Sequence, residues 1–457
     1  MNINAINISD MNIKTMEKSF FKYVLPSIVS TMLGGLYIVV DGFFIGNSMG
    51  DIGLTAINLV YPIGTFLAAA AVMLGMGGSV IMSSYLGDNN IEGFNKAKVN
   101  TFISLLISSI ILTVILLLLK NHIIYLLGAR DEVFRQADSY ITVIILGGGF
   151  QIISFGCMPI IRNLGKTIQA MIFMGLGLIT NIILDYLFLM VFRLEMFGAA
   201  LATIIAQALV SVTAVYYLFI RKKNRTKIKL SDFDLSMTKR ALQIGLSPFG
   251  LVMAPSFIVI LNNWQCIKYG GYLGTSAYSV MNYIYASILY LFEGVAEGCQ
   301  PMISYFKGAL RNDMMKKVFI KGILFNIILG LILIIIVLIL KNKLGILFGA
   351  SLETNSIVSF SLPIISIAFI IQPIVRLGTA YFYSSEEIRY SALLTYIDPL
   401  FISPLCILIL PLFFKLNGIF FAIPISQFIL LILFLFIFYN SNFKNDNLLN
   451  KAVYENE

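Results

Sequence analysis

Two aspartates stand inside long apolar runs of the sequence. Asp41 lies in the run Leu36–Gly46, and Asp185 lies in the run Asn181–Tyr186. A carboxylate at the centre of a bilayer costs roughly 2.5–3.5 kcal/mol on insertion scales. A membrane protein keeps a carboxylate at such a depth where the group binds a proton, a cation or a charged substrate. The sequence therefore predicts that these two positions handle ions.

The side chains near these aspartates suit a small cation. Asn181 and Asp185 are four residues apart, which places them on one face of a helix. Thr203 ends a stretch of small residues that allows close helix packing, and it supplies a hydroxyl. Oxygens of these types replace water around Na⁺, and buried carboxylates can instead hold a proton. The sequence does not distinguish between Na⁺ and H⁺ as the bound ion. The alternative is that each aspartate only hydrogen-bonds a neighbouring helix.

The composition is that of a membrane protein. The chain has 457 residues, of which 58% are hydrophobic and 12% charged, and its mean hydropathy is +0.89. Soluble domains do not carry so much apolar surface. The apolar runs are long and unbroken, which favours helices over barrel strands. We expect an all-α polytopic protein of about 12 transmembrane helices, near residues 20–46, 54–85, 98–120, 136–161, 168–192, 197–220, 241–268, 274–305, 317–340, 356–382, 390–414 and 417–440.

The two halves of the chain resemble each other. Ser84-Tyr85 recurs as Ser304-Tyr305, and Gln207 recurs as Gln427, in both cases 220 positions later. A shared offset indicates an internal duplication. We expect two six-helix lobes related by a pseudo-two-fold axis along the membrane normal. The predicted parts are a cytoplasmic segment 1–19, an N-lobe 20–220, a basic linker 221–240, a C-lobe 241–440 and a cytoplasmic tail 441–457.

The net charge of +9 reflects membrane orientation rather than nucleic-acid binding. With the predicted segments, 23 of the 32 Lys and Arg residues fall on the side of the termini and 8 on the other side, and Arg376 lies within a segment. Basic residues concentrate on the cytoplasmic side of membrane proteins. We therefore expect a multi-pass protein of the cell membrane with both termini in the cytoplasm.

Four further polar residues in apolar segments are candidates for a substrate cavity: Glu293, Glu297, Asp398 and Asn263. Glu293 and Glu297 share one helix face and would attract a cationic substrate or pair with a lysine near the membrane edge. Asp398 precedes Pro399, so a kink would expose polar groups there. The four cysteines lack metal-ligand spacing, and we predict no metal centre apart from a possible Na⁺ at Asp41 and Asp185.

Several of these motifs resemble the multidrug and toxic compound extrusion (MATE) family. The segment Asn181–Phe188, followed by Phe197–Thr203 and Gln207, is similar to the family's fifth and sixth helices. The segments Val40–Gly46 and Gln300–Tyr305 resemble its first and eighth helices. The likeness runs from about residue 20 to 440.

The resemblance implies twelve helices in two lobes and export of organic compounds against an inward flow of sodium ions or protons. In one branch of the family, the cation site uses carboxylates and Asn and Thr partners, which here match Asp41, Asp185, Asn181 and Thr203. Another branch uses an acid in the seventh helix. The corresponding segment Pro248–Lys268 contains no carboxylate, so the resemblance favours the first site.

We therefore expect a secondary antiporter that exports amphipathic or cationic compounds by alternating access, with H⁺ or Na⁺ as coupling ion and no other cofactor. The expected partners are small organic substrates and the lipid bilayer, and the expected functional unit is a monomer. The alternative is a flippase for lipid-linked or polyisoprenyl substrates, which would need cationic groups in its cavity. A membrane enzyme is disfavoured because the chain has a single histidine, His122.

Overall fold

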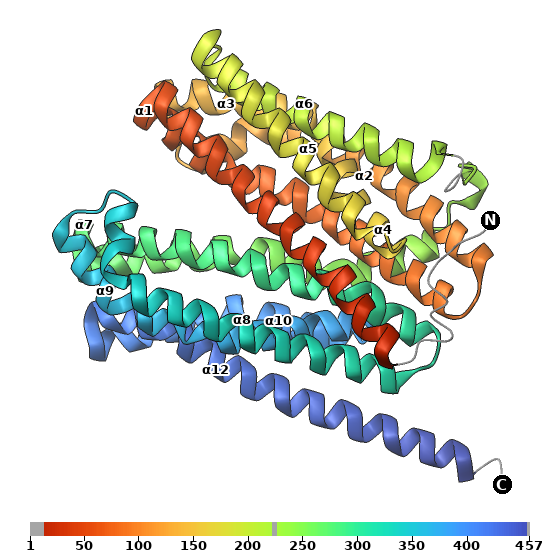
Figure 1. The fold of residues 1–457 in the computed structure, drawn as a ribbon. Coiled ribbons are helices and arrows are strands. Elements are labelled where there is room, and N and C mark those ends of the chain that lie inside the picture. The colour runs from red at the N-terminus through yellow and green to blue at the C-terminus, as the bar shows by residue number, and fades with distance from the viewer. Residues whose placement is uncertain (1–12, 222–225, 455–457) are drawn as a thin grey trace. The chain divides into compact units, whose positions relative to one another are not determined.

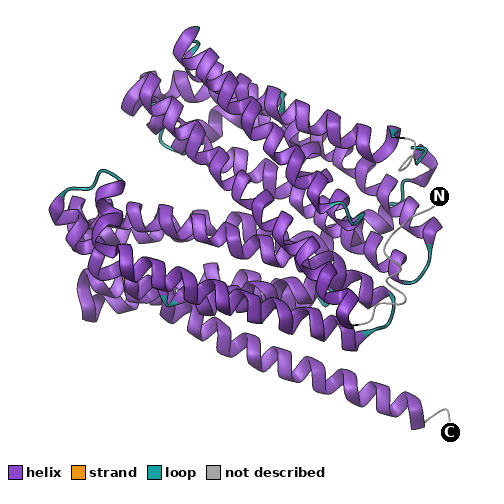
Figure 2. Ribbon diagram, in the orientation of Figure 1, coloured by secondary structure: helices purple, strands orange, loops and turns teal. Residues whose placement is uncertain are grey.

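The computed structural model describes residues 13–221 and 226–454 (Figure 1). Residues 1–12 of the predicted N-terminal segment, residues 222–225 of the predicted linker and residues 455–457 of the predicted tail lie outside this part. Every regular element within the described ranges is helical, as Figure 2 shows by colour. The predicted all-α fold class is confirmed.

The first half begins with two long helices and continues with shorter ones. Its elements are α1 (Ile13–Gly87), α2 (Ile91–Leu126), α3 (Asp131–Leu146), α4 (Gly148–Asn163), α5 (Thr167–Asp185), the π-helix η2 (Tyr186–Val191), α6 (Glu195–Val215) and the π-helix η3 (Tyr216–Ile220). The second half repeats this order after the short 3₁₀-helix η4 (Leu230–Asp232): α7 (Leu235–Gly308), α8 (Asn312–Leu347), α9 (Leu352–Ser366), α10 (Ala368–Ser384), α11 (Ile388–Ile397), the π-helix η5 (Asp398–Ile402) and α12 (Ser403–Tyr454).

The longest helices each contain a break in the helical backbone. In α1 the break is at Gly50, with φ 58° and ψ −144°, and in α7 it is at Gly271, with φ 56° and ψ −149°. A positive φ is accessible to glycine without the steric cost that a side chain would add. The two glycines are 221 residues apart and have nearly the same dihedral angles, which agrees with the duplication read from the sequence.

The predicted segments correspond to helices in the described ranges. Eight helices are long and apolar enough to cross a membrane, and the bent pairs α3–α4 (57°) and α9–α10 (43°) bring the number to ten. Two of the eight are double-length: α7, and the stretch Ile388–Ser441, which breaks at Lys415. Because the bilayer core is about 30 Å thick and a helix rises about 1.5 Å per residue, each must cross twice. Dividing both at their breaks gives the predicted twelve.

The chain forms two compact units. The first comprises the described residues of Met1–Met253 with Tyr290–Phe319 and Tyr383–Glu386. Within it, α1 packs against α2, α4 and α5, and α6 packs against α3, α4 and α5; Figure 1 shows these helices running alongside one another. Both ends of α7 therefore belong to this unit.

The second unit comprises Ala254–Leu289, Ile320–Phe382 and the described residues of Glu387–Glu457. In it, α12 packs against α9, α11 and η5. Cys406, Ile407 and Ala422 form a buried apolar cluster, against which Ile258 and Leu261 of α7 pack. The division of the chain into lobes at residues 220 and 241 stays a prediction.

Candidate ion site and neighbouring polar clusters

The four residues predicted to couple an ion come together within the first unit. Asp41 is carried by α1, Asn181 and Asp185 by the last turns of α5, and Thr203 by α6. All four side chains are buried, with Asp185 1% exposed and Asn181 fully covered. The packing of α5 against both α1 and α6 places them at one level. Gly177 permits this approach, because a Cβ there would lie 2.7 Å from Val210 of α6.

Most oxygens of this constellation lack a hydrogen-bond partner. Thr203 Oγ1 lies 3.5 Å from Asp41 Oδ2, a long contact. Asp185 and Asn181 lie within interaction range of Asp41, yet Asp41 Oδ1, both Asp185 oxygens and both polar atoms of Asn181 form no hydrogen bond. An unsatisfied buried polar group costs about 1–3 kcal/mol. An arrangement that leaves several such oxygens facing one another is suited to take up a proton or a small cation.

Two tyrosines complete the surroundings of the aspartates. Tyr37, one helical turn before Asp41 on α1, directs its hydroxyl to the carbonyl oxygen of Thr203 at 3.4 Å. Tyr140 of α3 lies within electrostatic range of both aspartates. Sequence reasoning missed both residues. The i, i+4 spacing of Tyr37 and Asp41 was a usable signal for the first, whereas nothing in the sequence links Tyr140 to the aspartates.

Glu297 forms a buried ion pair with Arg162. The atoms Arg162 Nη1 and Glu297 Oε2 are 2.7 Å apart, and the two side chains are 6% and 15% exposed. The approach is not aligned for a hydrogen bond, so the contact is an ion pair by distance. Glu297 was predicted either to attract a cationic substrate or to pair with a lysine. In the structure it pairs with a basic group, which is an arginine. Glu293, one turn earlier on α7, is half-buried in the same unit.

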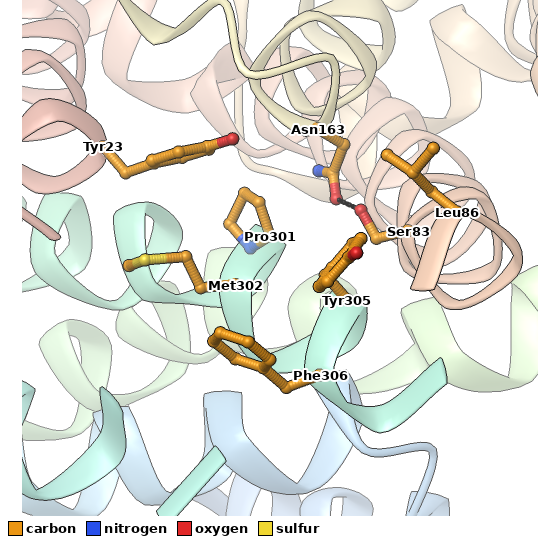
Figure 3. Close-up of a pocket in the computed structure, with 8 residues that line it drawn as sticks. All are labelled: Tyr23, Ser83, Leu86, Asn163, Pro301, Met302, Tyr305 and Phe306. Carbon is orange, nitrogen blue, oxygen red and sulfur yellow. Dashed lines mark hydrogen bonds between the residues drawn. The ribbon is translucent and has the colours of Figure 1, made fainter. Parts of the chain in front are cut away.

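A polar network adjoins this pair where α1, α4 and α7 end. Asn163 Nδ2 donates to Gln300 Oε1 at 2.9 Å, and Ser83 donates to Asn163 Oδ1. Ser304 Oγ donates to the carbonyl oxygen of Ser384 at 3.1 Å. Figure 3 shows Ser83 and Asn163 beside a pocket that is also lined by Tyr23, Leu86, Pro301, Met302, Tyr305 and Phe306. Tyr23 and Asp41 are 18 residues apart on α1, about 27 Å along the axis, so this pocket is separate from the aspartates.

The other two cavity candidates lie in the second unit. Asp398 begins η5 and accepts two hydrogen bonds, from Ser403 Oγ at 2.7 Å and from Gln427 Nε2 at 3.1 Å. Asn263 of α7 has a buried side-chain oxygen with no hydrogen-bond partner. Glu293 and Glu297 on one side and Asp398 and Asn263 on the other thus belong to different units. Their assignment to a substrate cavity stays a prediction.

The described residues contain no group of three or more His, Cys, Asp or Glu side chains that could hold a metal ion. The site in the first unit offers the carboxylates of Asp41 and Asp185, the amide of Asn181 and the hydroxyl of Thr203. This donor set suits a weakly held monovalent cation or a proton, because tight divalent sites use more charged ligands. Loose binding is what a site needs if its ion is to be released in every cycle.

Comparison with known proteins places these residues in a wider context. The MatE family matches residues 26–187 and 249–408. The chain is 24% identical over 432 residues to the multidrug export protein MepA of Staphylococcus haemolyticus, covering 93% of this chain and 94% of that protein. It is 25% identical to the MepA of Staphylococcus saprophyticus, covering 88% of each.

Two solved structures share the fold. One is an outward-facing multidrug resistance MATE family transporter of the MOP superfamily, with a TM-score of 0.87 and 22% identity over 92% of this chain and 94% of that one. The other is a MOP superfamily transporter from Pyrococcus furiosus whose binding pocket is described as having reverse polarity. Its TM-score is 0.86, with 22% identity over the same shares of the chains. At this level of identity the structures establish the fold alone.

Proposed function

The chain belongs to the MatE family, and we propose that it exports amphipathic or cationic organic compounds in exchange for protons or sodium ions that enter through the site at Asp41 and Asp185. Membership makes it a multi-pass membrane transporter and not an enzyme. The MepA relatives are multidrug export proteins, which supports organic compounds as cargo.

The observation that carries this proposal is the set of orphaned oxygens on Asp41, Asn181 and Asp185. Two carboxylates buried side by side repel each other when both are ionised, so the pair favours taking up at least one positive charge. An ion that neutralises them would allow α1 and α5 to pack closely. An ion that leaves would make the same region repulsive and polar.

Coupling follows from this difference between the two charge states. If the ion stabilises the conformation that releases cargo, then cargo must weaken ion binding by the same factor. A coupling free energy of about 1–3 kcal/mol changes the affinity about 5- to 150-fold. We further propose that the protein acts as a monomer in the cell membrane. Both termini lie in the cytoplasm in this proposal, because most Lys and Arg residues fall on the side of the termini in the predicted topology.

The test is transport by the Asp41→Asn variant in proteoliposomes. Asparagine keeps the shape of the side chain but cannot carry the charge. We expect the variant to lose export driven by an imposed pH or sodium gradient, by at least about tenfold, which corresponds to about 1.4 kcal/mol. Imposing one gradient at a time identifies the coupling ion.

Asp88→Asn is the matched control, because Asp88 is exposed in the turn after α1 and the substitution is chemically the same. This variant should transport like the unmodified protein. Unchanged gradient-driven export by Asp41→Asn, with both variants equally well inserted, would refute the proposed role of the first-unit site.

A further inference from the structure

We propose that Asp398 is a second cation-binding group, in the second unit, which holds a single positive charge on a sodium ion or on the charged group of an organic cargo. The proposal deepens the proposed function and rests on it, since it adds a second cation site to the same transporter. The residues involved are Asp398, Ser403, Gln427 and Tyr285, and we call them the Asp398 cluster.

The depth of Asp398 makes its charge costly. It stands ten residues after the first residue of α11, Ile388, which is about 15 Å along a helix in a core about 30 Å thick. The side chain is largely buried. A carboxylate at this depth is retained where it meets a partner or a transported charge.

The hydrogen bonds of Asp398 fix its oxygens without neutralising them. Ser403 and Gln427 are uncharged donors, at 2.7 Å and 3.1 Å. A carboxylate has about four lone-pair positions, so two remain for a cation. Among the described residues, Asp398 takes part in no ion pair.

Groups on α7 and α12 lie near this carboxylate. Tyr285 of α7 lies within electrostatic range of Asp398 and of Arg376 on α10. Its hydroxyl donates to Gln372 Oε1 at 2.5 Å, and its ring stacks on Phe369 at 6.1 Å between centroids. Cys406 of α12 is also within range of Asp398. Tyr285 thus brings one aromatic ring near the carboxylate, and aromatic faces attract organic cations.

The duplication indicates that the carboxylate of this cluster is particular to the second half, whereas Gln427 has a counterpart in Gln207. Gly50 and Gly271, and also the first residues of α5 and α11, are 221 positions apart. With that offset, Asp398 matches Gly177, where Val210 leaves no room for a side chain. The same offset matches Asp41 with Asn262 and Asp185 with Cys406. The second half therefore has no carboxylate at the positions that match Asp41 and Asp185, and Asp398 stands about two helical turns before Cys406.

The plainer interpretation is that Asp398 only braces a distorted helix. Pro399 lacks a backbone N–H, which is enough to explain the π-helical turn of η5. Ser403 could then serve as an ordinary local partner. This interpretation also accounts for two acceptor oxygens, because Ser403 and Gln427 donate to different oxygens of Asp398 and an asparagine has only one. It predicts that cations leave Asp398 unaffected, and that difference can be measured.

The experiment uses N,N′-dicyclohexylcarbodiimide, which reacts with carboxyl groups inside membranes. Trypsin cleaves after Arg389 and Lys415, and the peptide between them contains Asp398 as its one acidic residue. Mass spectrometry of this peptide thus reports on Asp398 directly. The experiment uses the full chain carrying Asp41→Asn and Asp185→Asn, which lacks the carboxylates of the first-unit site. The readout therefore does not depend on transport. Addition of Asp398→Asn corrects for reaction at Cys406 in the same peptide.

We expect modification at fixed pH to fall at least threefold with sodium chloride or with tetraphenylphosphonium, compared with N-methylglucamine chloride at equal ionic strength. Protection by sodium alone identifies an inorganic ion, and protection by tetraphenylphosphonium identifies the charged group of cargo. Modification that neither cation changes, or no modification of Asp398 between pH 5 and 9 in any salt, overturns the proposal. Failure of Asp41→Asn to affect transport would overturn the proposed function and leave this result untouched.

Discussion

Arg162, Lys98 and Glu297 are charged side chains that the structure largely covers. Lys98 is fully covered, and its Nζ donates to the carbonyl oxygen of Leu218 at 3.0 Å, beside the ring of Phe219. The sequence placed Lys98 at the first residue of a predicted segment, but α2 begins seven residues earlier, at Ile91. Arg162 was assigned to a loop and lies in the last turn of α4. The count of Lys and Arg residues on the two sides of the membrane therefore includes side chains, such as Lys98 and Arg162, that are buried within the helical bundle.

The ion pair of Arg162 and Glu297 allows a prediction at this scale. Glu297→Gln leaves a buried guanidinium without its counter-charge, and breaking a buried pair costs about 3–5 kcal/mol. We expect a lower midpoint of thermal unfolding in detergent. Replacing both residues by methionine should restore much of the loss, since a well-packed apolar pair can substitute for a buried ion pair.

Glu386→Gln is the matched control for that measurement. Glu386 pairs with Arg240 at 2.6 Å, but the arginine side chain is 44% exposed. Glu386 is 19% exposed and accepts hydrogen bonds from both Nε and Nη2 of Arg240, but water reaches the arginine, so this variant should lose less stability than Glu297→Gln. A double methionine variant that is less stable than Glu297→Gln would contradict the interpretation of the pair.

At the scale of elements, the ends of α1 and α7 touch through reciprocal glycines. A Cβ on Gly87 of α1 would lie 2.0 Å from the carbonyl oxygen of Tyr305, and a Cβ on Gly308 of α7 would lie 1.8 Å from that of Ser84. These are the Ser-Tyr pairs that repeat in the sequence 220 positions apart. Each half thus presents the same motif to the other within the first unit, and the contact is between backbones.

Gly308→Ala should therefore force these two helix ends apart. Overpacking a close contact costs about 1–3 kcal/mol, and carbonyl oxygens of a helix cannot turn aside as a flexible side chain would. We expect a lower unfolding midpoint, measured by scanning fluorimetry. Gly64→Ala is the control, because a Cβ there meets nothing within 4 Å. Equal midpoints for the two variants would show that the helix ends adjust freely.

The twelve segments could be predicted because apolar length is a direct consequence of bilayer thickness. Asp41, Asn181, Asp185 and Thr203 could be grouped because helical spacing and the family resemblance both pointed to them. The surroundings of Asp398 could be predicted only in part: Pro399 indicates a distorted helix, whereas the contact of Asp398 with Gln427 depends on how α11 and α12 pack. The partner of Glu297 was missed for a similar reason: Arg162 is 135 residues away, and only tertiary structure joins them.

For the whole molecule, the proposed orientation can be tested with single introduced cysteines. The four native cysteines, Cys157, Cys266, Cys299 and Cys406, are all buried, so they give little background with a membrane-impermeant maleimide. In the proposed topology, Asp88→Cys follows α1 on the side of the termini, and Glu353→Cys lies in the first turn of α9 on the opposite side; both positions are exposed.

In intact cells the reagent should label Glu353→Cys and spare Asp88→Cys, because the excess of Lys and Arg on the side of the termini retains that side in the cytoplasm. Permeabilised cells serve as the control, and both variants should then react equally. The opposite pattern would reverse the orientation. It would also reverse the direction of the proposed exchange, since ions would then reach Asp41 and Asp185 from the other side for the same conformation. Labelling of both positions in intact cells would place both outside the cell. An even number of spans would then separate Asp88 from Glu353, instead of the odd number proposed, and the twelve-span topology would fail.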